Sequence, residues 1–479
     1  MKLKAQIRDI LANAQVDETL EIAGWVVTRR TQKNWSFVEL NDGSTVQGLQ
    51  VVIDATVPNY EENINAANSG AAIKIQGTVV ESPGQNQRIE LHAQSFEIIG
   101  IVENDYPLQK KRQTPVFLRE NAHLRVRTKV MGMSTRVRSA CAQSIHKFFN
   151  EHGFHYVHSP ILTASDCEGA GEMFQVTTLD MNNPPRLGKN GEGPVDFSKD
   201  FFGKKTFLTV SGQLSAENLA CGLGRVYTFG PTFRAENSNT SRHASEFWMI
   251  EPEMAFANLQ DDADLAEGFL QTVIADVLNT CQSDLEFCEQ IITNQKFSSP
   301  FFEDSKSSLL KNLQKVATTP FQRVTYTEAI DLLNKSGKSF DHPTNWGDAL
   351  QTEHERYLAE ELFNAPTIVT DYPAAFKSFY MYLNDDGKTV RAMDVLVPRI
   401  GEIIGGSQRE DRLDVLKDRI QHHGLNEEDY WWYMDLRKYG SVPHAGFGLG
   451  FERLVMYVTG LANIRDVISF PRVPKHVEF

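Results

Sequence analysis

The chain has 479 residues, of which 41% are hydrophobic and 23% charged, and this composition is typical of a soluble globular protein with two or three domains. The net charge of −14 argues against a general attraction to nucleic acid, no apolar run reaches the ~18 residues of a membrane-spanning helix, and the polar N-terminus is unlike a secretory signal. Five cysteines without a CxxC pair argue against a disulfide framework or a zinc site, so we expect a cytoplasmic protein.

The first hundred residues are predicted to form strands, separated by turn signals such as Asn41-Asp42-Gly43. The expected strands are Leu20–Thr31, Ser36–Leu40, Val46–Ile53, Ala71–Val80 and Arg88–Gly100. A polar stretch that is compatible with a helix, Asn59–Asn68, lies between the third and fourth strands. Five strands with a helix in this place match the OB-fold, a small barrel that commonly binds oligonucleotides. We therefore predict a five-stranded OB-fold β-barrel at residues 1–103.

One face of this barrel is expected to carry side chains that suit single-stranded bases. These side chains are Trp25, Arg29, Phe37, Gln47 and Gln50. Aromatic rings stack on bases, and amide groups donate and accept hydrogen bonds at base edges. Trp25 and Phe37 could each belong to the barrel core instead, and the sequence leaves both possibilities open.

A basic segment follows the barrel. A linker is predicted at residues 104–119, and a helix is predicted from Glu120 to about Glu151. Between residues 110 and 138, nine basic side chains stand against one acidic side chain, Glu120. A solvated helix face explains such a run, and so does a track for a polyanion.

Residues 120–479 are predicted to form one large α+β domain. Its β-rich runs alternate with hairpins and long connections instead of regular βαβ units, which favours an antiparallel sheet with flanking helices. These runs are Thr206–Val210, Arg225–Phe229, Phe247–Met254, Ala392–Leu396 and Gly446–Phe451.

The most informative segment of this domain is residues 234–253, where cations, an aromatic ring and four glutamates flank a polar turn. Arginine forms bidentate charge-assisted hydrogen bonds with phosphate, and an aromatic side chain suits a stacked purine. Acidic residues near a phosphate site suggest a divalent metal ion. A hairpin of this kind could hold a nucleoside triphosphate, although a charged surface hairpin would have a similar composition.

Three segments in order resemble the signature motifs of the class II aminoacyl-tRNA synthetases. The segment Gly153-Phe-His-Tyr-Val-His-Ser-Pro160 resembles motif 1 (residues 153–163), the hairpin at 234–253 resembles motif 2, and Gly446-Phe-Gly-Leu-Gly-Phe-Glu-Arg453-Leu resembles motif 3 (residues 446–460). With the predicted OB-fold, the chain is similar over nearly its whole length to the aspartyl/asparaginyl/lysyl subgroup. P-loop and Rossmann folds are disfavoured because the sequence has neither GxxxxGK[ST] nor a strand-borne GxGxxG.

The resemblance implies how ATP and magnesium would be bound. Arg234 would hold the α-phosphate and its developing charge, with Arg242 and His243 on the β- and γ-phosphates. Asp394 and Glu402 would bind Mg²⁺. An acid that caps a strand would look the same as Asp394.

The resemblance also implies the adenine site and the oligomeric state. Phe247 and Arg453 would sandwich adenine, with Arg453 taking part in catalysis beside Arg234, and Glu236 would accept from the adenine amino group. Pro160 belongs to motif 1, which in this class forms a dimer interface, so we expect a homodimer.

The segment Ser211-Gly-Gln213-Leu-Ser-Ala216-Glu217 carries the choice of amino acid. Ser211 and Gln213 are expected to line the amino-acid pocket, and Glu168 matches the glutamate that binds the substrate α-amino group. Aspartyl enzymes carry a lysine where Ala216 stands, and here Glu217 follows. A carboxylate at Glu217 would accept from the amide of asparagine and would repel aspartate by about 4 kcal/mol at ~4 Å and an effective dielectric constant of ~20.

Arg409 matches the arginine that binds the substrate side chain in the subgroup, and it would neutralise Glu217 in the empty pocket. The expected reaction is therefore the ATP-dependent activation of L-asparagine to asparaginyl-adenylate and its transfer to the 3′ end of tRNA(Asn). The polar stretch Met181–Lys199 resembles bacterial members of the subgroup.

On the barrel, Phe37 and Gln47 match the aromatic residue and glutamine that the subgroup uses on the central anticodon base, with Arg29 nearby. The turn before Gln47 is one residue shorter than in bacterial aspartyl enzymes, so Gln50 is an alternative to Gln47.

Three other functions fit parts of the sequence. An aspartyl or dual-specificity synthetase is disfavoured by Ala216 and Glu217, and an asparagine synthetase-like relative outside translation is disfavoured by the barrel with Phe37. A pure nucleic-acid-binding module would not need Arg234, Glu402 and Arg453 together.

Overall fold

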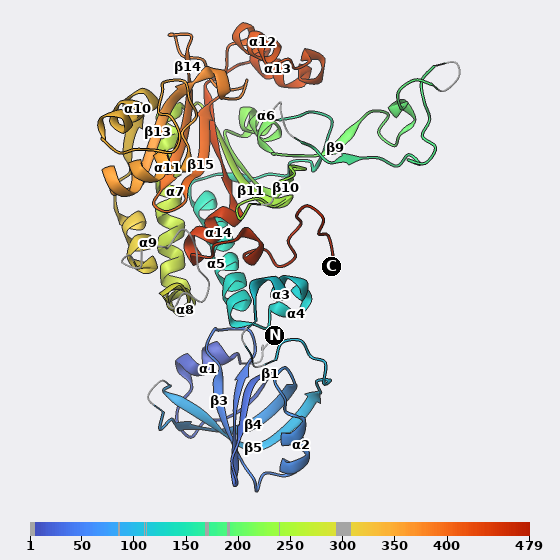
Figure 1. Ribbon diagram of the computed structural model, residues 1–479, viewed down its shortest axis with the longest axis vertical. Helices are drawn as coiled ribbons and strands as arrows, with labels where there is room; N and C mark the ends of the chain where they lie inside the picture. Colours follow the sequence, from blue (N-terminus) through green and yellow to red (C-terminus); the bar gives the residue numbers. More distant parts are fainter. Residues whose placement is uncertain are drawn as a thin grey trace. The chain divides into compact units, whose positions relative to one another are not determined.

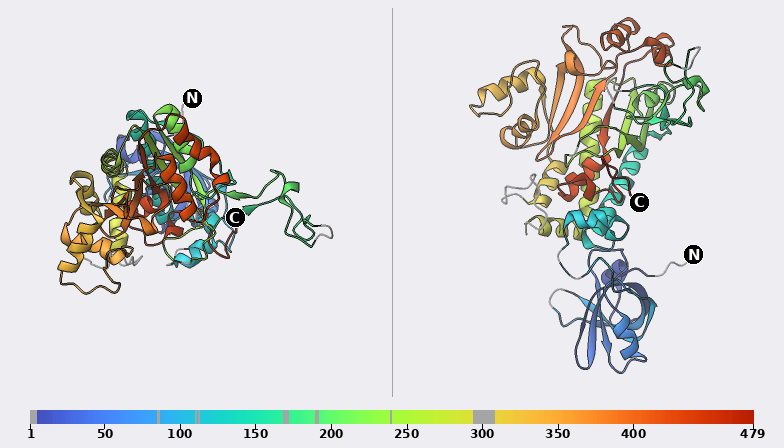
Figure 2. Two further views of the ribbon diagram at one scale, coloured as in Figure 1. Left: turned by 90° about the horizontal axis from the view of Figure 1, so that it is seen from above. Right: turned by 45° about the vertical axis from the view of Figure 1, so that its right-hand side comes forward.

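The computed structural model of the chain describes residues 5–84, 87–109, 111, 113–167, 172–188, 192–238, 240–293 and 308–479. Contacts within the chain divide it into two compact units, whose elements are labelled in Figure 1 and seen from two more directions in Figure 2. The first unit contains residues 1–137 with 281–288 and 479, and the second contains residues 138–280 with 289–478. The first unit thus includes the predicted linker at 104–119 and continues beyond it.

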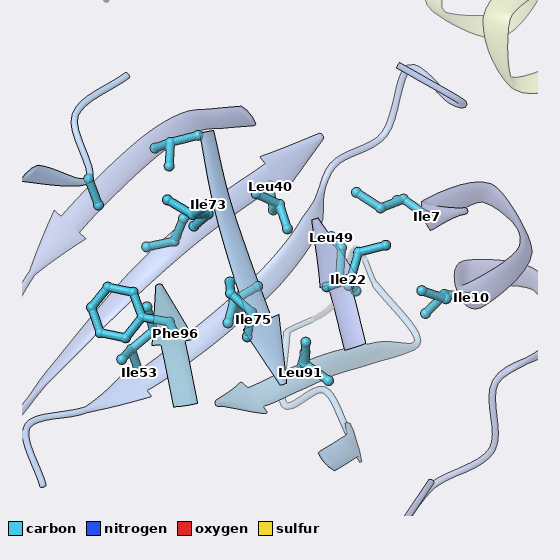
Figure 3. Close-up of a cluster of buried hydrophobic side chains, with 14 of the residues drawn as sticks. Ile7, Ile10, Ile22, Leu40, Leu49, Ile53, Ile73, Ile75, Leu91 and Phe96 are labelled. Carbon is cyan, nitrogen blue, oxygen red and sulfur yellow. The ribbon is translucent and has the colours of Figure 1, made fainter. Parts of the chain in front are cut away.

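The first unit is built on a closed barrel with the strand order β1-β2-β3-β5-β4. Its elements are α1 (Ile7–Asn13), β1 (Thr19–Thr31), β2 (Trp35–Asn41), β3 (Leu49–Asp54), α2 (Tyr60–Ala66), β4 (Ala72–Glu81) and β5 (Ile89–Gly100). Alternate apolar side chains of the strands fill the interior, where Ile22, Leu40, Ile73 and Leu91 are buried (Figure 3). The predicted five-stranded barrel with its inserted helix is confirmed. Trp25 does not belong to this core, because 41% of its surface is exposed.

The single helix predicted from Glu120 to about Glu151 is broken in its first part. The structure has α3 (Pro115–Glu120), α4 (Ala122–Arg125) and α5 (Lys129–Glu151). Asn121 separates the first two with a non-helical backbone (φ −112°, ψ 41°), and the Thr128 hydroxyl donates to the Arg125 carbonyl oxygen at 2.6 Å. Such local side-chain bonds compete with the helical backbone pattern, which apolar periodicity alone does not reveal.

The second unit is built on an eight-stranded sheet with the order β12-β13-β14-β15-β16-β11-β10-β6. Its strands are β6 (His155–Tyr156), β10 (Arg225–Phe233), β11 (Glu246–Ala255), β12 (Gln322–Thr325), β13 (Thr367–Pro373), β14 (Thr389–Val397), β15 (Gly401–Gln408) and β16 (His444–Gly450). The pairs between β13 and β10 are all antiparallel, as predicted, while the two edge pairs β12–β13 and β10–β6 are parallel. A small sheet with the order β7-β9-β8 (Leu162–Thr163, Thr206–Leu208 and Gln175–Val176) precedes β10.

The helices that pack on the large sheet include α6 (Gln213–Leu223), α7 (Leu259–Thr280), α10 (Tyr326–Lys335), α11 (Thr352–Arg356) and α14 (Phe451–Thr459). Helix α9 (Leu309–Thr318) packs on α7, and α13 (Trp431–Lys438) packs on α6 and on α12 (Leu413–His422). Helix α8 (Gln282–Thr293) begins in the first unit. Aromatic rings join α5 and α7 to the sheet, because Phe149 stacks on Tyr227 of β10 at 4.4 Å and on Phe269 of α7 at 5.2 Å. The predicted α+β class is confirmed.

Glycine allows β16 to lie close to β11. A Cβ atom at Gly446 would lie well inside contact distance of the Pro252 carbonyl oxygen and 2.5 Å from Cδ of Glu253. The run of small residues in this strand is therefore a packing requirement of the sheet, since backbone atoms of β11 cannot move aside as a flexible side chain can.

We predict that Gly446→Ala lowers the free energy of unfolding by about 1–3 kcal/mol, the usual cost of overpacking. The matched control is Gly222→Ala on α6, where a new Cβ has no atom within 4 Å, and it should be neutral or stabilising. Urea denaturation of both variants measures the difference. Equal stability of the two variants would contradict this explanation of the glycine.

Candidate active site

A cavity of about 290 Å³ opens at the ends of β10, β11, β15 and β16. Its walls include all the side chains that the resemblance assigned to ATP: Arg234, Glu236, Arg242, His243, Phe247 and Arg453. Glu402 also lines it. We call this space the nucleotide cavity.

The β10–β11 register explains one side of the nucleotide cavity. Thr232 pairs with Phe247, and the Arg234 backbone N–H donates to the Ser245 carbonyl oxygen at 3.0 Å. The Arg234 guanidinium thereby lies 5.4 Å from the centre of the Phe247 ring. A cation and an aromatic ring thus face the cavity from neighbouring positions of one hairpin.

Arg453 enters from the first turn of α14, and a buried network fixes that turn. Its Nη1 donates to the Glu402 carbonyl oxygen at 3.2 Å. The adjacent Glu452 carboxylate pairs with Arg138 of α5 at 2.8 Å and accepts from the Trp248 backbone N–H at 2.8 Å. These two contacts join α14 to α5 and β11, so Arg453 has little freedom at its backbone.

The nucleotide cavity collects positive charge. Burial and the neighbouring Arg453 lower the pKa of Arg242. An anion between these guanidinium groups would favour their charged forms. This arrangement suits a polyphosphate.

Two acidic side chains lie close together beside the nucleotide cavity, and one of them, Glu402, lines it. Asp394 of β14 and Glu402 of β15 lie close together, since a Cβ at Gly405 would be 3.4 Å from Glu402 Oε1 and 3.6 Å from Asp394 Oδ1. Burial and Asp394 raise the pKa of Glu402. Lys377 donates to Asp394 at 2.9 Å. Two carboxylates in this position fit the ligand needs of Mg²⁺, which keeps several waters.

A third acidic residue, Glu355 of α11, was missed in the sequence. Its carboxylate accepts from the Glu402 backbone N–H at 3.1 Å. Burial and the charge of Glu402 raise the pKa of Glu355 to about 7. No local pattern marks this residue, because it lies 47 positions before Glu402 and on a helix.

A second cavity of about 270 Å³ shares Glu402 with the first. Its walls include Gln213, Lys377, Tyr380, Asp394 and Arg409. Gln213 and Arg409, both predicted for the amino acid, are therefore brought together here. We call this space the amino-acid cavity.

Glu217 does not line the amino-acid cavity, which corrects the prediction that it contacts the substrate directly. Its carboxylate is completely buried and accepts from Gln213 Nε2 at 3.1 Å, Tyr433 Oη at 2.7 Å and Arg437 Nη2 at 3.1 Å, and it lies 3.0 Å from His444 Nε2. Glu217 lies one turn of α6 after Gln213 on the same face, and it reaches α13 and β16 behind the Gln213 side chain.

Two other predicted amino-acid residues have different outcomes. Ser211 donates to the Glu251 carboxylate and is absent from the cavity wall, so it supports the loop before α6 instead. Glu168 lies outside the described residues.

Arg409 is paired with Glu253, which the sequence interpretation also missed. Two guanidinium nitrogens donate to the Glu253 carboxylate, and Nη1 donates to Ser407 Oγ at 2.8 Å. Glu217 is farther away, at 3.8 Å from Arg409 Nε. Burial, with the nearby Glu217, raises the pKa of Glu253 to about 8 although Arg409 opposes the shift. Glu251 and Glu253 are two residues apart, so both lie on the inward face of β11. Two acidic residues at this spacing in an apolar strand could have identified them from the sequence as buried polar groups.

The barrel has a separate groove of about 330 Å³, lined by Phe37, Gln50, Arg30 and Glu39 among others. Arg30 lies over the Phe37 ring at 5.2 Å. The predicted Arg29 instead donates to the Ile64 carbonyl oxygen, because a bulge between Val26 and Thr28 shifts the face of β1.

Gln47 is also absent from this groove. Strand β3 begins at Leu49, so Gln47 lies in the preceding turn with its carbonyl oxygen bound to Asn41, while Gln50 lies on the groove wall. The geometry therefore favours Gln50, the alternative that the sequence left open.

Motif 1 lies at the β6 edge of the sheet. Tyr156 is 59% exposed, and Ile161 and Leu162 after Pro160 are also exposed. Apolar side chains at a sheet edge are a common feature of surfaces that bind other proteins.

Comparisons with known proteins agree with this geometry. Residues 115–474 match the family "tRNA synthetases class II (D, K and N)", and residues 20–99 match "OB-fold nucleic acid binding domain". The chain is 56% identical to the asparagine–tRNA ligase of Thermosynechococcus vestitus over 478 residues, covering 100% of both chains, and 55% identical to that of Synechocystis, covering 99% and 100%.

The chain also aligns over its whole length with solved structures of asparaginyl-tRNA synthetases. The asparaginyl-tRNA synthetase of Pyrococcus horikoshii complexed with asparaginyl-adenylate aligns with a TM-score of 0.82 and 31% identity over 100% of both chains. The enzyme of Entamoeba histolytica aligns with a TM-score of 0.81 and 26% identity, again over 100% of both chains. In the described part of this chain, no helix is long and apolar enough to cross a membrane.

A buried acid beside Arg409 makes stability depend on pH. Asp262 of α7 is completely buried, neither carboxylate oxygen has a hydrogen-bond partner among the described residues, and burial raises its pKa to about 8. The folded state therefore holds a proton that the unfolded state, with a pKa of about 4, releases.

We predict that the free energy of unfolding of the wild type falls relative to that of Asp262→Asn as the pH rises from about 4 to about 8. The difference should change by up to about 1.4 kcal/mol per pH unit. Above that window the difference should stay constant. Urea denaturation of both proteins at several pH values measures it, and parallel pH profiles would show that Asp262 ionises normally.

Proposed function

The chain belongs to the class II tRNA synthetases of the D, K and N family, and within them to the asparagine–tRNA ligases, and we propose that its two adjoining cavities carry out the activation step with the residue roles given below. The enzyme activates asparagine with ATP and transfers the asparaginyl group to tRNA(Asn). The observation that supports the proposed division of labour is that Glu402 lines both cavities, so the amino acid and the triphosphate would meet there.

In the proposed activation step, the asparagine carboxylate attacks the α-phosphorus and pyrophosphate leaves, giving asparaginyl-adenylate. This step needs little proton transfer, so positioning and charge stabilisation provide the catalysis. Arg234 stabilises the charge on the α-phosphate, while Arg242 and His243 hold the outer phosphates. The amino acid itself is held between Gln213 and Arg409.

The adenine ring would lie between Phe247 and Arg453, with Glu236 accepting from its amino group. Asp394 and Glu402 are the residues that would hold Mg²⁺, which would neutralise phosphate charge when bound. The raised pKa of Glu402 beside Asp394 supports this assignment, because a cation would relieve the repulsion between the two carboxylates.

Residues 1–103 are the proposed anticodon-binding domain, residues 104–119 the linker and residues 120–479 the catalytic domain. Phe37 would stack on an anticodon base, with Gln50 and Arg30 beside it in the groove. Gln50 Nε2 donates to Glu90 at 3.0 Å, which fixes its amide orientation before RNA binds.

We also propose that two copies associate through the β6 edge and motif 1. The exposed apolar side chains Tyr156, Ile161 and Leu162 support this surface. We assign the enzyme to the cytoplasm, in keeping with five cysteines that form no disulfide.

The wild type should catalyse ATP–pyrophosphate exchange with asparagine, with kcat/KM for aspartate lower by about a hundredfold or more. Arg234→Ala should reduce kcat/KM for asparagine about 10²- to 10³-fold, the usual effect of removing a donor from developing charge. Arg323→Ala, which removes an ion-paired surface arginine, is the control and should keep wild-type activity. Exchange at the wild-type rate by Arg234→Ala would refute its assigned role.

The native mass should be twice the 54.0 kDa of the chain. Leu162→Arg should shift the equilibrium toward monomers, because a charge would be buried in the interface. Ile101→Arg, at an exposed apolar position of the other unit, should leave the dimer intact. Sedimentation velocity separates these species, and a monomeric wild type would exclude the proposed dimer.

A further inference from the structure

We propose that Glu217 contributes to the choice of asparagine without touching it, by fixing the side-chain amide of Gln213 so that the amide oxygen faces the amino-acid cavity. The inference rests on the proposed function, since it concerns the same cavity. Glu217 is then a positioning residue, and Gln213 is the residue that meets the substrate.

The geometry of helix α6 determines which end of the Gln213 amide faces Glu217. Gln213 and Glu217 are four residues apart and lie on the same face of the helix. Gln213 Nε2 donates to Glu217 Oε1 at 3.1 Å. An ionised carboxylate only accepts hydrogen bonds, so the nitrogen end of the Gln213 amide must face it. The oxygen end is therefore left on the opposite side, toward the cavity that Gln213 lines.

The surrounding side chains keep the Glu217 carboxylate ionised, which is the form that only accepts hydrogen bonds. Tyr433 Oη and Arg437 Nη2 both donate to its other oxygen, at 2.7 and 3.1 Å, and His444 Nε2 lies 3.0 Å from the same oxygen. Burial opposes the ionisation of Glu217, but the hydrogen bond with His444 and the charge of Arg437 outweigh it, and the pKa of Glu217 is lowered. Three elements, α6, α13 and β16, thus fix the orientation of one amide.

The Gln213 amide lies beside Arg409, the residue that the resemblance assigns to the substrate side chain. Glu217 Oε1 lies 3.1 Å from Gln213 Nε2 and 3.8 Å from Arg409 Nε. Gln213 and Arg409 therefore lie side by side. Arg409 offers donors and Gln213 offers an acceptor, which is the pattern that matches the carbonyl oxygen and NH₂ of a primary amide.

A carboxylate in this place would present only acceptors. One of its oxygens would face the fixed amide oxygen of Gln213 without a proton between them, which leaves both groups unpaired in a buried site. If Gln213 could rotate its amide by half a turn, it would offer NH₂ and this discrimination would disappear. Glu217 prevents that rotation.

The test is a double-mutant cycle measured by ATP–pyrophosphate exchange with asparagine and with aspartate. Glu217→Gln should lower the ratio of kcat/KM for asparagine to that for aspartate about tenfold or more, mainly through KM for asparagine. In the Gln213→Ala background, Glu217→Gln should leave the ratio unchanged, because the residue through which Glu217 acts is missing.

Other outcomes overturn the proposal. An equal loss of the ratio in both backgrounds means that Glu217 acts on the substrate directly, and an unchanged ratio in Glu217→Gln means that it has no part in selection. If Glu217→Gln does not fold, Gln213→Leu tests the same claim, since it removes the acceptor and must lower the ratio. A retained ratio in Gln213→Leu overturns the proposal.

Asp284→Asn is the matched control. Asp284 is also a buried carboxylate held by an arginine, Arg136 at 2.7 Å, but both lie in the first unit. This variant should lose stability and keep the wild-type ratio. Absence of asparagine-dependent exchange in the wild type would contradict the proposed function itself, whereas normal exchange with no coupling would contradict only the role of Glu217.

Discussion

The register of the β10–β11 hairpin is the constraint on which both cavities depend. Because side chains alternate along β11, Phe247, Glu251 and Glu253 lie on the same face of the sheet, with Phe247 at the nucleotide cavity and the two glutamates further along the strand. Glu253 then binds Arg409, and Glu251 holds the loop that begins α6. A shift of one residue would turn each of these groups to the other side of the sheet. One hairpin thus contributes to both cavities and supports the helix that carries Gln213.

Around this hairpin the enzyme keeps an unusual number of ionisable side chains in its interior. Glu217, Glu253 and Asp262 are completely buried beside Arg409 and Arg437. A well-packed apolar core would be more stable than such a cluster, because removing charges from water is costly. The cluster is understandable at a site that must distinguish an amide from a carboxylate, since only fixed donors and acceptors in a low dielectric make that distinction large.

The parts of the site that could be predicted from sequence are those encoded locally. Arg234 and Phe247 belong to one hairpin, and the barrel strands have clear turn signals, so these features follow from short-range pattern and from the family resemblance. Glu217 was predicted to face the substrate, but its carboxylate faces Arg437 and His444. The sequence did not reveal this orientation, because both partners are more than 200 residues away. Arg29 was predicted at the position on the groove that Arg30 occupies, because a bulge in β1 shifts the alternation of its side chains.

The large sheet ends in very short strands. Strand β6 has two residues and β12 has four, whereas β10 and β11, the next strands inward from β6, have nine and ten. A short edge offers few unpaired backbone groups to a strand from another molecule. Newly made chains can therefore complete this sheet with little risk that it grows into a fibrillar aggregate, and any association at the β6 edge must depend on the fit of side chains instead of on open backbone hydrogen bonding.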